Sequence, residues 1–178
     1  MHIPENVLKL WDKYRIQEKI RRHSVKVTEI ALRLAQKIKG VNMEIVKIGA
    51  LLHDIGRAIT DDPFEHFLVS AEILKKEGFP EKIVLIAERH FGAGLTKDEA
   101  KKLGLPEKDY LPVSLEEKIV CHADNLANGD KERTFEEYLC KLDELAKERA
   151  DMKWLIERSK ERAKRLNSEL ACLTMLDT

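Results

Sequence analysis

Apolar residues recur at helical spacing along nearly the whole chain, and this periodicity constrains the fold more than any other feature of the sequence. In residues 17–39 the positions that share one helical face are Ile20, His23, Val27, Ile30, Leu34 and Ile38. No segment shows a convincing alternation of apolar and polar residues, the pattern typical of a half-buried strand. The sequence therefore predicts an all-α protein.

Local start and stop signals divide this pattern into separate helices. The periodicity predicts helices over residues 17–39, 43–55, 62–78 and 80–90. A serine or threonine followed three residues later by glutamate predicts further helix starts at Thr96, Ser114 and Thr134.

The last segment, residues 131–176, is rich in charge and carries apolar residues at helical spacing. This spacing predicts either one long or two consecutive amphipathic helices. We expect these helices to cover the core and to leave a solvated outer face. The alternative is that they form the surface of a homodimer.

Length and charge limit the size class and the partner class. A chain of 178 residues is close to the size of one domain, which predicts a single domain over residues 1–178. Lys plus Arg and Asp plus Glu both number 32, so the formal net charge is zero. This balance does not indicate a strongly basic nucleic-acid binder, although charge alone leaves a nucleic-acid partner open. A small or local partner fits better.

The cysteines and the N-terminus indicate the compartment. The three cysteines form no CxxC pair, and their odd number argues against a closed disulfide framework. The first residues carry charges and lack the apolar stretch of a signal peptide, and no run of 18 apolar residues occurs. The sequence therefore predicts a reduced, cytoplasmic protein without a membrane segment.

The residues that carry chemistry are one His-Asp pair and two inward-facing residues far from it. His53 and Asp54 begin the motif HDIG at the end of a helix that is apolar nearly all round. His23 lies 30 residues before His53, and Asp124 lies 70 residues after Asp54, each on its own predicted helix. Buried carboxylates need cationic partners, and a bound metal ion would explain why all four residues face inward.

These residues resemble the pattern of the HD-domain superfamily, and more narrowly of its HDIG-type members. The stretches that carry the resemblance are RHSVKVTEIALRLA, GALLHDIGR and VCHADNL, which span about residues 22–129. The resemblance implies a bundle of antiparallel helices with a core over about residues 17–129, and it leaves the additional C-terminal helices over 131–176 unexplained. The residues that it implies as ligands of a divalent metal are His23, His53, Asp54 and Asp124.

The chemistry of this ligand set agrees with that implication. Two imidazoles and two carboxylates from three helices form a mixed nitrogen and oxygen site with open positions for water and substrate. We expect one or two divalent ions per chain, drawn from Mn, Co, Ni, Fe, Zn and Mg. The alternative is that these are ordinary buried histidines and carboxylates at helix ends.

A second ion depends on two further histidines. His66 lies 12 residues after Asp54, and His90 ends an apolar helical face. The resemblance implies that Asp54 bridges two ions and that His66 and His90 bind the second one. The alternative is that both histidines are hydrogen-bonded residues of the cleft wall. Arg89 favours this alternative, because many two-metal relatives carry a doubled histidine there.

Arg57 is the candidate for holding a substrate phosphate. Its planar guanidinium could bind a phosphate through two hydrogen bonds, and the alternative is a surface salt bridge to Asp61 or Asp62. We predict Asp54 and Arg57 as the catalytic residues.

Two further positions carry expectations about the shape of the site. His122 lies two residues before Asp124, roughly 200° round a helix, so we expect it to point elsewhere. Residues 91–113 contain two prolines and three glycines, and we expect a substrate lid there.

The resemblance implies a metal-dependent phosphohydrolase, either a phosphomonoesterase or a phosphodiesterase, that acts through metal-activated water on a nucleotide or a similar small phosphate ester. Two other classes of function fit the same residues. One is a di-iron oxygenase of the HD type, which uses the same six ligand types. The other is a non-catalytic module that binds metal or nucleotide in RNA or nucleotide metabolism.

Overall fold

Helices make up most of the structure, as the periodicity predicts. The computed structural model describes residues 1–175, so residue 176 of the predicted C-terminal segment lies outside the described part. The α-helices are α1 Glu5–Lys13, α2 Glu18–Ala35, α3 Met43–Leu52, α4 His66–Lys76, α5 Glu81–Arg89, α6 Lys97–Lys102, α7 Leu115–Leu126, α8 Phe135–Glu148 and α9 Lys153–Met175. Short 3-10 helices, η1 Ile55–Ala58 and η2 Ala150–Met152, follow α3 and α8.

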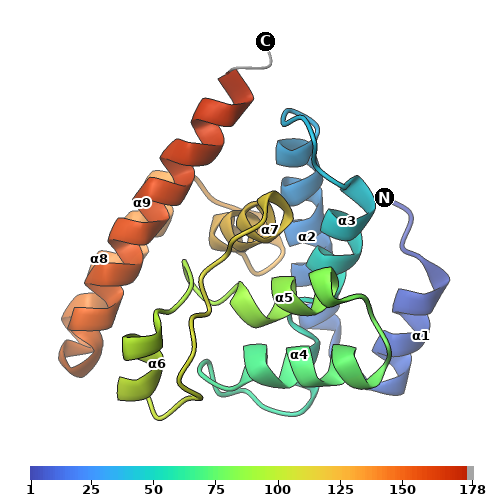
Figure 1. The fold of residues 1–178 in the computed structure, drawn as a ribbon, viewed down its shortest axis with the longest axis horizontal. Coiled ribbons are helices and arrows are strands. Elements are labelled where there is room, and N and C mark those ends of the chain that lie inside the picture. The colour runs from blue at the N-terminus through green and yellow to red at the C-terminus, as the bar shows by residue number, and fades with distance from the viewer. Residues whose placement is uncertain (176–178) are drawn as a thin grey trace.

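Four helices, α2, α3, α5 and α7, form the centre of the fold. Each of α3 and α7 contacts the other three, and α4 lies along α5 (Figure 1). The residues that fill the space between these helices are fully buried and apolar, among them Val27, Ile30, Val46 and Ile119. The central helices carry the residues of the predicted site, so their packing decides where those side chains meet.

Three of the predicted helix boundaries are wrong. Helix α3 ends at Leu52 and not at residue 55, because the chain continues into the 3-10 helix η1 after Asp54. Helix α2 ends at Ala35 and not at residue 39, because Lys37 N and Ile38 N donate to carbonyls three residues back and so tighten the end of the helix. Helix α4 begins at His66 and not at residue 62, because the Asp62 carboxylate accepts a hydrogen bond from Phe64 N and stabilises a turn there.

The all-α class is confirmed, and the described residues add one very short hairpin that the sequence did not indicate. Strand β1 Ala127–Asn128 pairs antiparallel with β2 Lys131–Glu132. A hairpin of two residues on each side is too short for an alternating pattern to be visible in the sequence. Gly129, with φ of 62°, adopts the left-handed conformation that its tight turn requires.

The predicted helix starts at Thr96, Ser114 and Thr134 are confirmed. Thr96 and Thr134 form complete capping boxes with the glutamates three residues later. At Ser114 only the first half of the motif forms: Ser114 Oγ accepts from Glu117 N, while the Glu117 carboxylate binds Val113 N and Arg89.

The C-terminal segment forms two helices, which decides between the two predicted arrangements. Helices α8 and α9 pack against each other, and α9 crosses α7 (Figure 1). Leu166 and Leu170 of α9 are buried in the core cluster that includes Ile119 of α7, and Ala163 is buried in a cluster with Tyr138 of α8. The outer faces of α8 and α9 carry the charged residues, as expected for helices that cover the core. Within the described residues, no helix is long and apolar enough to span a membrane.

Candidate metal centre

The structure brings all six predicted metal ligands together in one buried cluster. His23 comes from α2 and Asp124 from α7; His53 and Asp54 follow α3, while His66 begins α4 and His90 follows α5. His53, Asp54, His66 and His90 are each at most 5% exposed. The cluster therefore lies where the ends of the central helices converge.

One side of the cluster surrounds the Oδ2 atom of Asp54. His23 Nε2 lies 3.8 Å and His53 Nε2 lies 3.9 Å from this oxygen. The same two nitrogens lie 2.9 Å and 3.5 Å from Asp124 Oδ1. Two imidazole nitrogens and two carboxylate oxygens thus point into one small volume.

The other side of the cluster surrounds Asp54 Oδ1. His66 Nε2 lies 3.3 Å and His90 Nε2 lies 3.4 Å from this atom. The two imidazole nitrogens are 3.1 Å apart. Asp54 therefore stands between two groups of ligands and presents one carboxylate oxygen to each.

Backbone carbonyls fix the direction in which each imidazole points. The pairs in which an Nδ1 atom lies within hydrogen-bond distance of a carbonyl oxygen are His23 with Gly129 (3.1 Å), His53 with Ala50 (2.7 Å), His66 with Asp62 (3.3 Å) and His90 with Ala87 (2.7 Å). A carbonyl can only accept, so the Nδ1 atom of a neutral ring must carry the proton. In that tautomer all four Nε2 atoms face the cluster as lone pairs, the arrangement that metal-binding histidines use.

A divalent cation fits this arrangement. Two buried atoms of the cluster, His53 Nε2 and Asp54 Oδ1, have no hydrogen-bond partner among the described residues. Such atoms are costly to bury unless something binds them. His66 Nε2 and His90 Nε2 lie 3.1 Å apart, and if both rings are neutral with protonated Nδ1 atoms, a cation between the two lone pairs would stabilise this arrangement. The cluster is compatible with divalent metal ions. Metal binding by these six residues stays a prediction.

The charges of the cluster shift the ionisation of its members. Burial would raise the pKa of Asp54, but the imidazoles of His53, His90 and His66 hold it well below its usual range. Burial lowers the pKa of His23, yet the hydrogen bond with Asp124 and the nearby carboxylate charges outweigh this and raise it to about 9. Burial and the positive potential of His90 lower the pKa of His66 to about 3.

Gly56, the glycine of HDIG, allows η1 to approach α4 closely. A Cβ atom at this position would lie 2.1 Å from the carbonyl oxygen of His66 and 2.6 Å from Ser70 N. Gly56 N also donates to Ser70 Oγ at 2.8 Å. Any larger residue would push the start of α4, and with it His66, away from Asp54.

Arg57 lies at the edge of the cluster. Its Nε atom is 3.3 Å from Asp54 Oδ2, and its Nη1 donates to the backbone carbonyl of Asp61 at 3.4 Å. The predicted alternative, a salt bridge to the carboxylate of Asp61 or Asp62, is therefore wrong. The side chain lines the cavity in front of the cluster.

This cavity has a volume of about 270 Å³ and includes residues that the sequence did not reveal. Arg133, which follows the hairpin, lines it and donates Nε to the carbonyl of Asn125 at 2.9 Å. Its guanidinium lies over the ring of Tyr138, 5.0 Å from the centroid, and its two terminal nitrogens have no hydrogen-bond partner among the described residues. Asn125 lines the cavity as well. Arg133 lies in no motif of the sequence, whereas Asn125 lies beside Asp124 in the stretch VCHADNL.

Phe91 and Gly92 are the residues of the expected lid segment, 91–113, that line the cavity. Leu95, Ala100 and Tyr110 are at most 1% exposed and belong to a packed apolar cluster, whereas most of residues 97–109 are exposed. A substrate lid in this segment stays a prediction.

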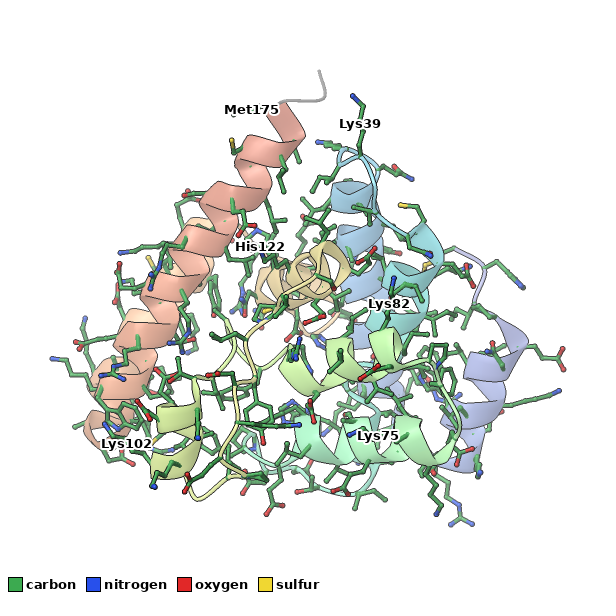
Figure 2. The ribbon with its side chains drawn as sticks, in the orientation of Figure 1. Lys39, Lys75, Lys82, Lys102, His122 and Met175 are labelled. Carbon is green, nitrogen blue, oxygen red and sulfur yellow. The ribbon has the colours of Figure 1, made fainter. Side chains whose placement is uncertain are left out.

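His122 is a buried histidine outside the cluster, as expected. It lies between α7 and the C-terminal helices, with its ring centroid 5.7 Å from that of Phe135 (Figure 2). Burial lowers its pKa to about 4. His122 is therefore a buried histidine that can be compared with the histidines of the cluster.

Comparison with known sequences gives one family match. The model of the HD domain matches residues 20–129. An uncharacterized protein of Methanocaldococcus jannaschii is 50% identical over 144 residues, which cover 78% of this chain and 85% of that protein.

Two larger enzymes contain a similar segment. The tRNA (cytidine(56)-2'-O)-methyltransferase of Picrophilus torridus is 52% identical over 110 residues, 62% of this chain. Ribonuclease Y of Thermosipho melanesiensis is 34% identical over 132 residues, 70% of this chain. The matched segments make up 32% of the methyltransferase and 22% of the ribonuclease.

A similar fold occurs in a solved structure. The crystal structure of the HD domain of the L. monocytogenes phosphodiesterase PgpH in complex with cyclic-di-AMP has a TM-score of 0.54 and a sequence identity of 22%. The alignment covers 97% of both chains. At this identity the likeness concerns the fold alone.

Proposed function

Because this chain belongs to the HD-domain family, we propose that it is a metal-dependent phosphohydrolase that acts on a nucleotide or a similar phosphate ester. The observation that carries the proposal is the division of the cluster at Asp54. One oxygen of Asp54 faces His23 and His53, and the other faces His66 and His90.

The residues that would hold the ions follow from this division. His23, His53, Asp54 and Asp124 would hold a first divalent ion, and Asp54, His66 and His90 would hold a second. When bound, such ions supply positive charge that polarises a phosphoryl oxygen and makes water more acidic. The backbone hydrogen bonds to Nδ1 keep the imidazoles oriented toward the cavity, so little reorganisation is needed when ligands bind.

Two arginines at the cavity would bind the phosphate. Arg57 and Arg133 line the cavity that also contains Asp54 and Asp124. Guanidinium groups bind phosphate oxygens through paired hydrogen bonds. Arg133 is held in place through its Nε atom, which leaves its two terminal nitrogens for a ligand. The arginines would hold the phosphate at the metal cluster and offset its negative charge next to two carboxylates.

The names of two relatives support a phosphodiester as substrate. PgpH is described as a phosphodiesterase and binds cyclic-di-AMP in its crystal structure, and ribonuclease Y is named as a nuclease. The methyltransferase name gives no support to hydrolysis, and the matched segments make up 32% of that enzyme and 22% of the ribonuclease. We therefore propose a phosphate ester of a nucleotide as the substrate class, with a monoester as the alternative.

A screen with metal-stripped protein tests this proposal. Phosphatase and phosphodiesterase activities are measured on a nucleotide panel after addition of Mn, Co, Ni, Fe, Zn or Mg. We expect activity with at least one metal in the wild type, loss of that activity in Asp54→Ala, and wild-type activity in Asp98→Ala, which alters an exposed aspartate outside the cavity.

Three outcomes would contradict the proposal. Activity that survives in Asp54→Ala would remove this residue from the mechanism. An iron-containing protein that consumes oxygen with a polyol or phosphonate, and releases no phosphate, would be an oxygenase. No turnover with any metal, combined with thermal stabilisation by a nucleotide, would indicate a non-catalytic binding module.

A further inference from the structure

We propose that a groove between α8, α9 and the loop after α5 is a binding site for a nucleobase, so that a nucleotide lies with its phosphate in the metal cavity and its base in this groove. The phosphate half of this arrangement rests on the proposed function. The base half concerns a separate set of side chains, most of them in the C-terminal helices that the family match does not include.

The groove is mostly apolar and has a volume of about 350 Å³. Its lining includes Phe64 and Phe91, whose ring centroids are 5.4 Å apart. It also includes Leu142 and Leu145 from α8 and Leu155 from α9. Aromatic and aliphatic side chains that line one groove suit a planar ring, because every nucleobase has two apolar faces.

The groove adjoins the metal cavity. Phe91, Gly92 and Asn125 line both spaces. Gly92 has a φ of 56°, and a Cβ atom there would lie 2.9 Å from Ser159 Oγ. A larger residue would therefore be strained and would crowd the junction between the two spaces. A ligand that extends from the cluster across this junction reaches the apolar walls.

Polar groups at the groove can serve the edge of a base. Asn125 Nδ2 donates to Gly92 O at 2.7 Å, which leaves the Asn125 Oδ1 atom as an acceptor. Tyr138 lines the groove and is 5% exposed, and its hydroxyl makes no hydrogen bond with the described residues. A purely aliphatic group would leave these polar atoms unsatisfied, whereas a base carries donors and acceptors on its edge.

Charge assigns the orientation of the ligand. Arg149, at the groove, already binds the carboxylate of Asp151 through two hydrogen bonds of 3.1 Å and 2.9 Å. Arg57 and Arg133 lie at the metal cavity instead. The phosphate therefore belongs to the cavity, and the uncharged ring belongs to the groove.

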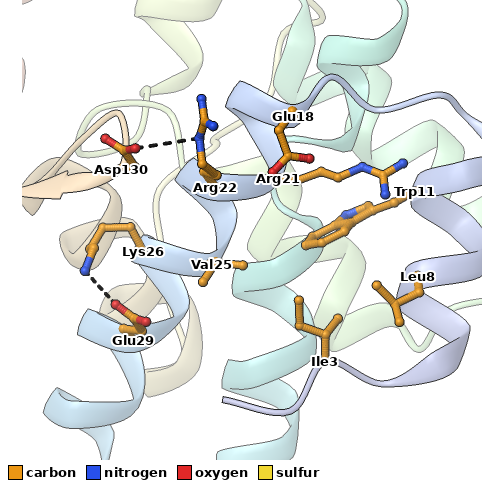
Figure 3. A pocket seen from close by; sticks show the side chains of 10 residues that line it. All are labelled: Ile3, Leu8, Trp11, Glu18, Arg21, Arg22, Val25, Lys26, Glu29 and Asp130. Carbon is orange, nitrogen blue, oxygen red and sulfur yellow. Dashed lines mark hydrogen bonds and ion pairs between the residues drawn. The ribbon is translucent and has the colours of Figure 1, made fainter.

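A second pocket provides a matched control. It lies between α1 and α2, has a volume of about 380 Å³ and is lined by Leu8, Trp11 and several charged residues (Figure 3). It shares no lining residue with the metal cavity. Leu8 is 39% exposed and Leu145 is 38% exposed, so truncation of either leucine removes a similar amount of exposed apolar surface.

The test compares ligands that differ only in the base. Calorimetry measures the affinity of the full chain, loaded with Mn, for ribose 5-phosphate and for the four common nucleoside 5′-monophosphates. KM replaces Kd for any compound that turns over, and phosphate release is followed in the same samples. We expect at least one nucleotide to bind roughly tenfold more tightly than ribose 5-phosphate. Leu145→Ala should reduce this preference about threefold or more, and Leu8→Ala should leave it unchanged.

Several results would overturn the nucleobase site. One is equal affinity for ribose 5-phosphate and every nucleotide, or binding of none of them. Another is a preference that Leu8→Ala reduces and Leu145→Ala does not. A third is conversion of a dimer to a monomer by Leu145→Ala with an unchanged preference, which would make the groove a subunit interface. A tenfold preference without phosphate release under any metal would support the nucleobase site and would contradict only the phosphomonoesterase alternative of the proposed function, because these nucleotides contain no phosphodiester bond.

Discussion

The metal cluster and the C-terminal groove lie side by side but are built in different ways. The cluster consists of buried polar side chains from α2, α7 and the residues next to α3, α4 and α5, and each imidazole is oriented by a backbone carbonyl. The groove consists largely of apolar side chains on two amphipathic helices, with Leu145 partly in contact with solvent. A change at the cluster therefore disturbs a polar network, whereas a change at the groove alters only shape and contact area.

This difference predicts that the cluster and the groove have separate roles in the protein. The cluster is suited to one chemistry, because its ligand atoms are fixed by the packing of the central helices. The groove can vary in sequence without disturbing those helices, so it is suited to substrate selection. The following predictions test whether the two regions can be changed independently.

The largest expected effect is loss of the second ion in His66→Ala. We expect metal content to fall from two ions to one per chain and activity to fall by about 100-fold or more, because Asp54 Oδ1 and His90 lose their shared partner. His122→Ala is the control, since His122 is 4% and His66 is 3% exposed. Elemental analysis measures the metal content of each variant, and kinetics measures its activity. Two ions in His66→Ala, or loss of an ion in His122→Ala, would contradict the assignment.

Metal binding should stabilise the fold. At a metal concentration about 100 times Kd, binding to the native state alone contributes about 2.7 kcal/mol, which corresponds to roughly 5–10 °C in Tm for a chain of this size. Thermal unfolding of metal-stripped protein with and without Mn measures the shift. Leu145→Ala should show the same shift, and Asp54→Ala should show none. A shift that persists in Asp54→Ala would place the ion elsewhere.

The metal-free protein should lose stability as the pH rises above neutrality. The pKa of His23 is about 9 in the folded chain against an ordinary 6.5. Protonated His23 therefore stabilises the fold below pH 6.5, and this contribution is lost as the pH rises through 9. We expect the free energy of unfolding to fall by at most about 3 kcal/mol over this range. Denaturant unfolding of wild type and His23→Gln measures it; equal pH dependence in both proteins would refute the prediction.

The smallest effect is expected for a substitution that weakens the packing of α9 beside the groove. Arg162 on α9 donates to Glu99 Oε1 and to Gly94 O, both at 2.9 Å, and Glu99 is 0% exposed. Arg162→Ala should destabilise the fold by about 2 kcal/mol, because the buried Glu99 would lose its near charged partner and keep the more distant Arg158 and the N–H group of Thr96.

Lys164→Ala, which breaks an exposed pair with Glu161, should change stability by less than about 0.5 kcal/mol. Metal content should be the same in Arg162→Ala, Lys164→Ala and the wild type. Loss of metal in Arg162→Ala would show that the two regions depend on each other.

The sequence by itself determined the helical class, most helix positions and the six residues of the cluster. Helical periodicity shows which side of a helix is buried, so His23 and Asp124 could be recognised as inward-facing residues among charged neighbours. The HDIG motif supplied His53 and Asp54. Helix ends were less predictable, because hydrogen bonds of single side chains, such as that of Asp62 at the start of α4, decide them.

Only the tertiary structure decided how these residues are arranged in space. Periodicity places a side chain on a face but does not say which of the two oxygens of Asp54 meets which histidine. It also could not bring Arg133 to the cavity or join the groove to it, because those contacts depend on how α7, α8 and α9 pack. The physical reason is that local sequence controls backbone conformation within a few residues, whereas the meeting of distant side chains depends on the packing of whole helices.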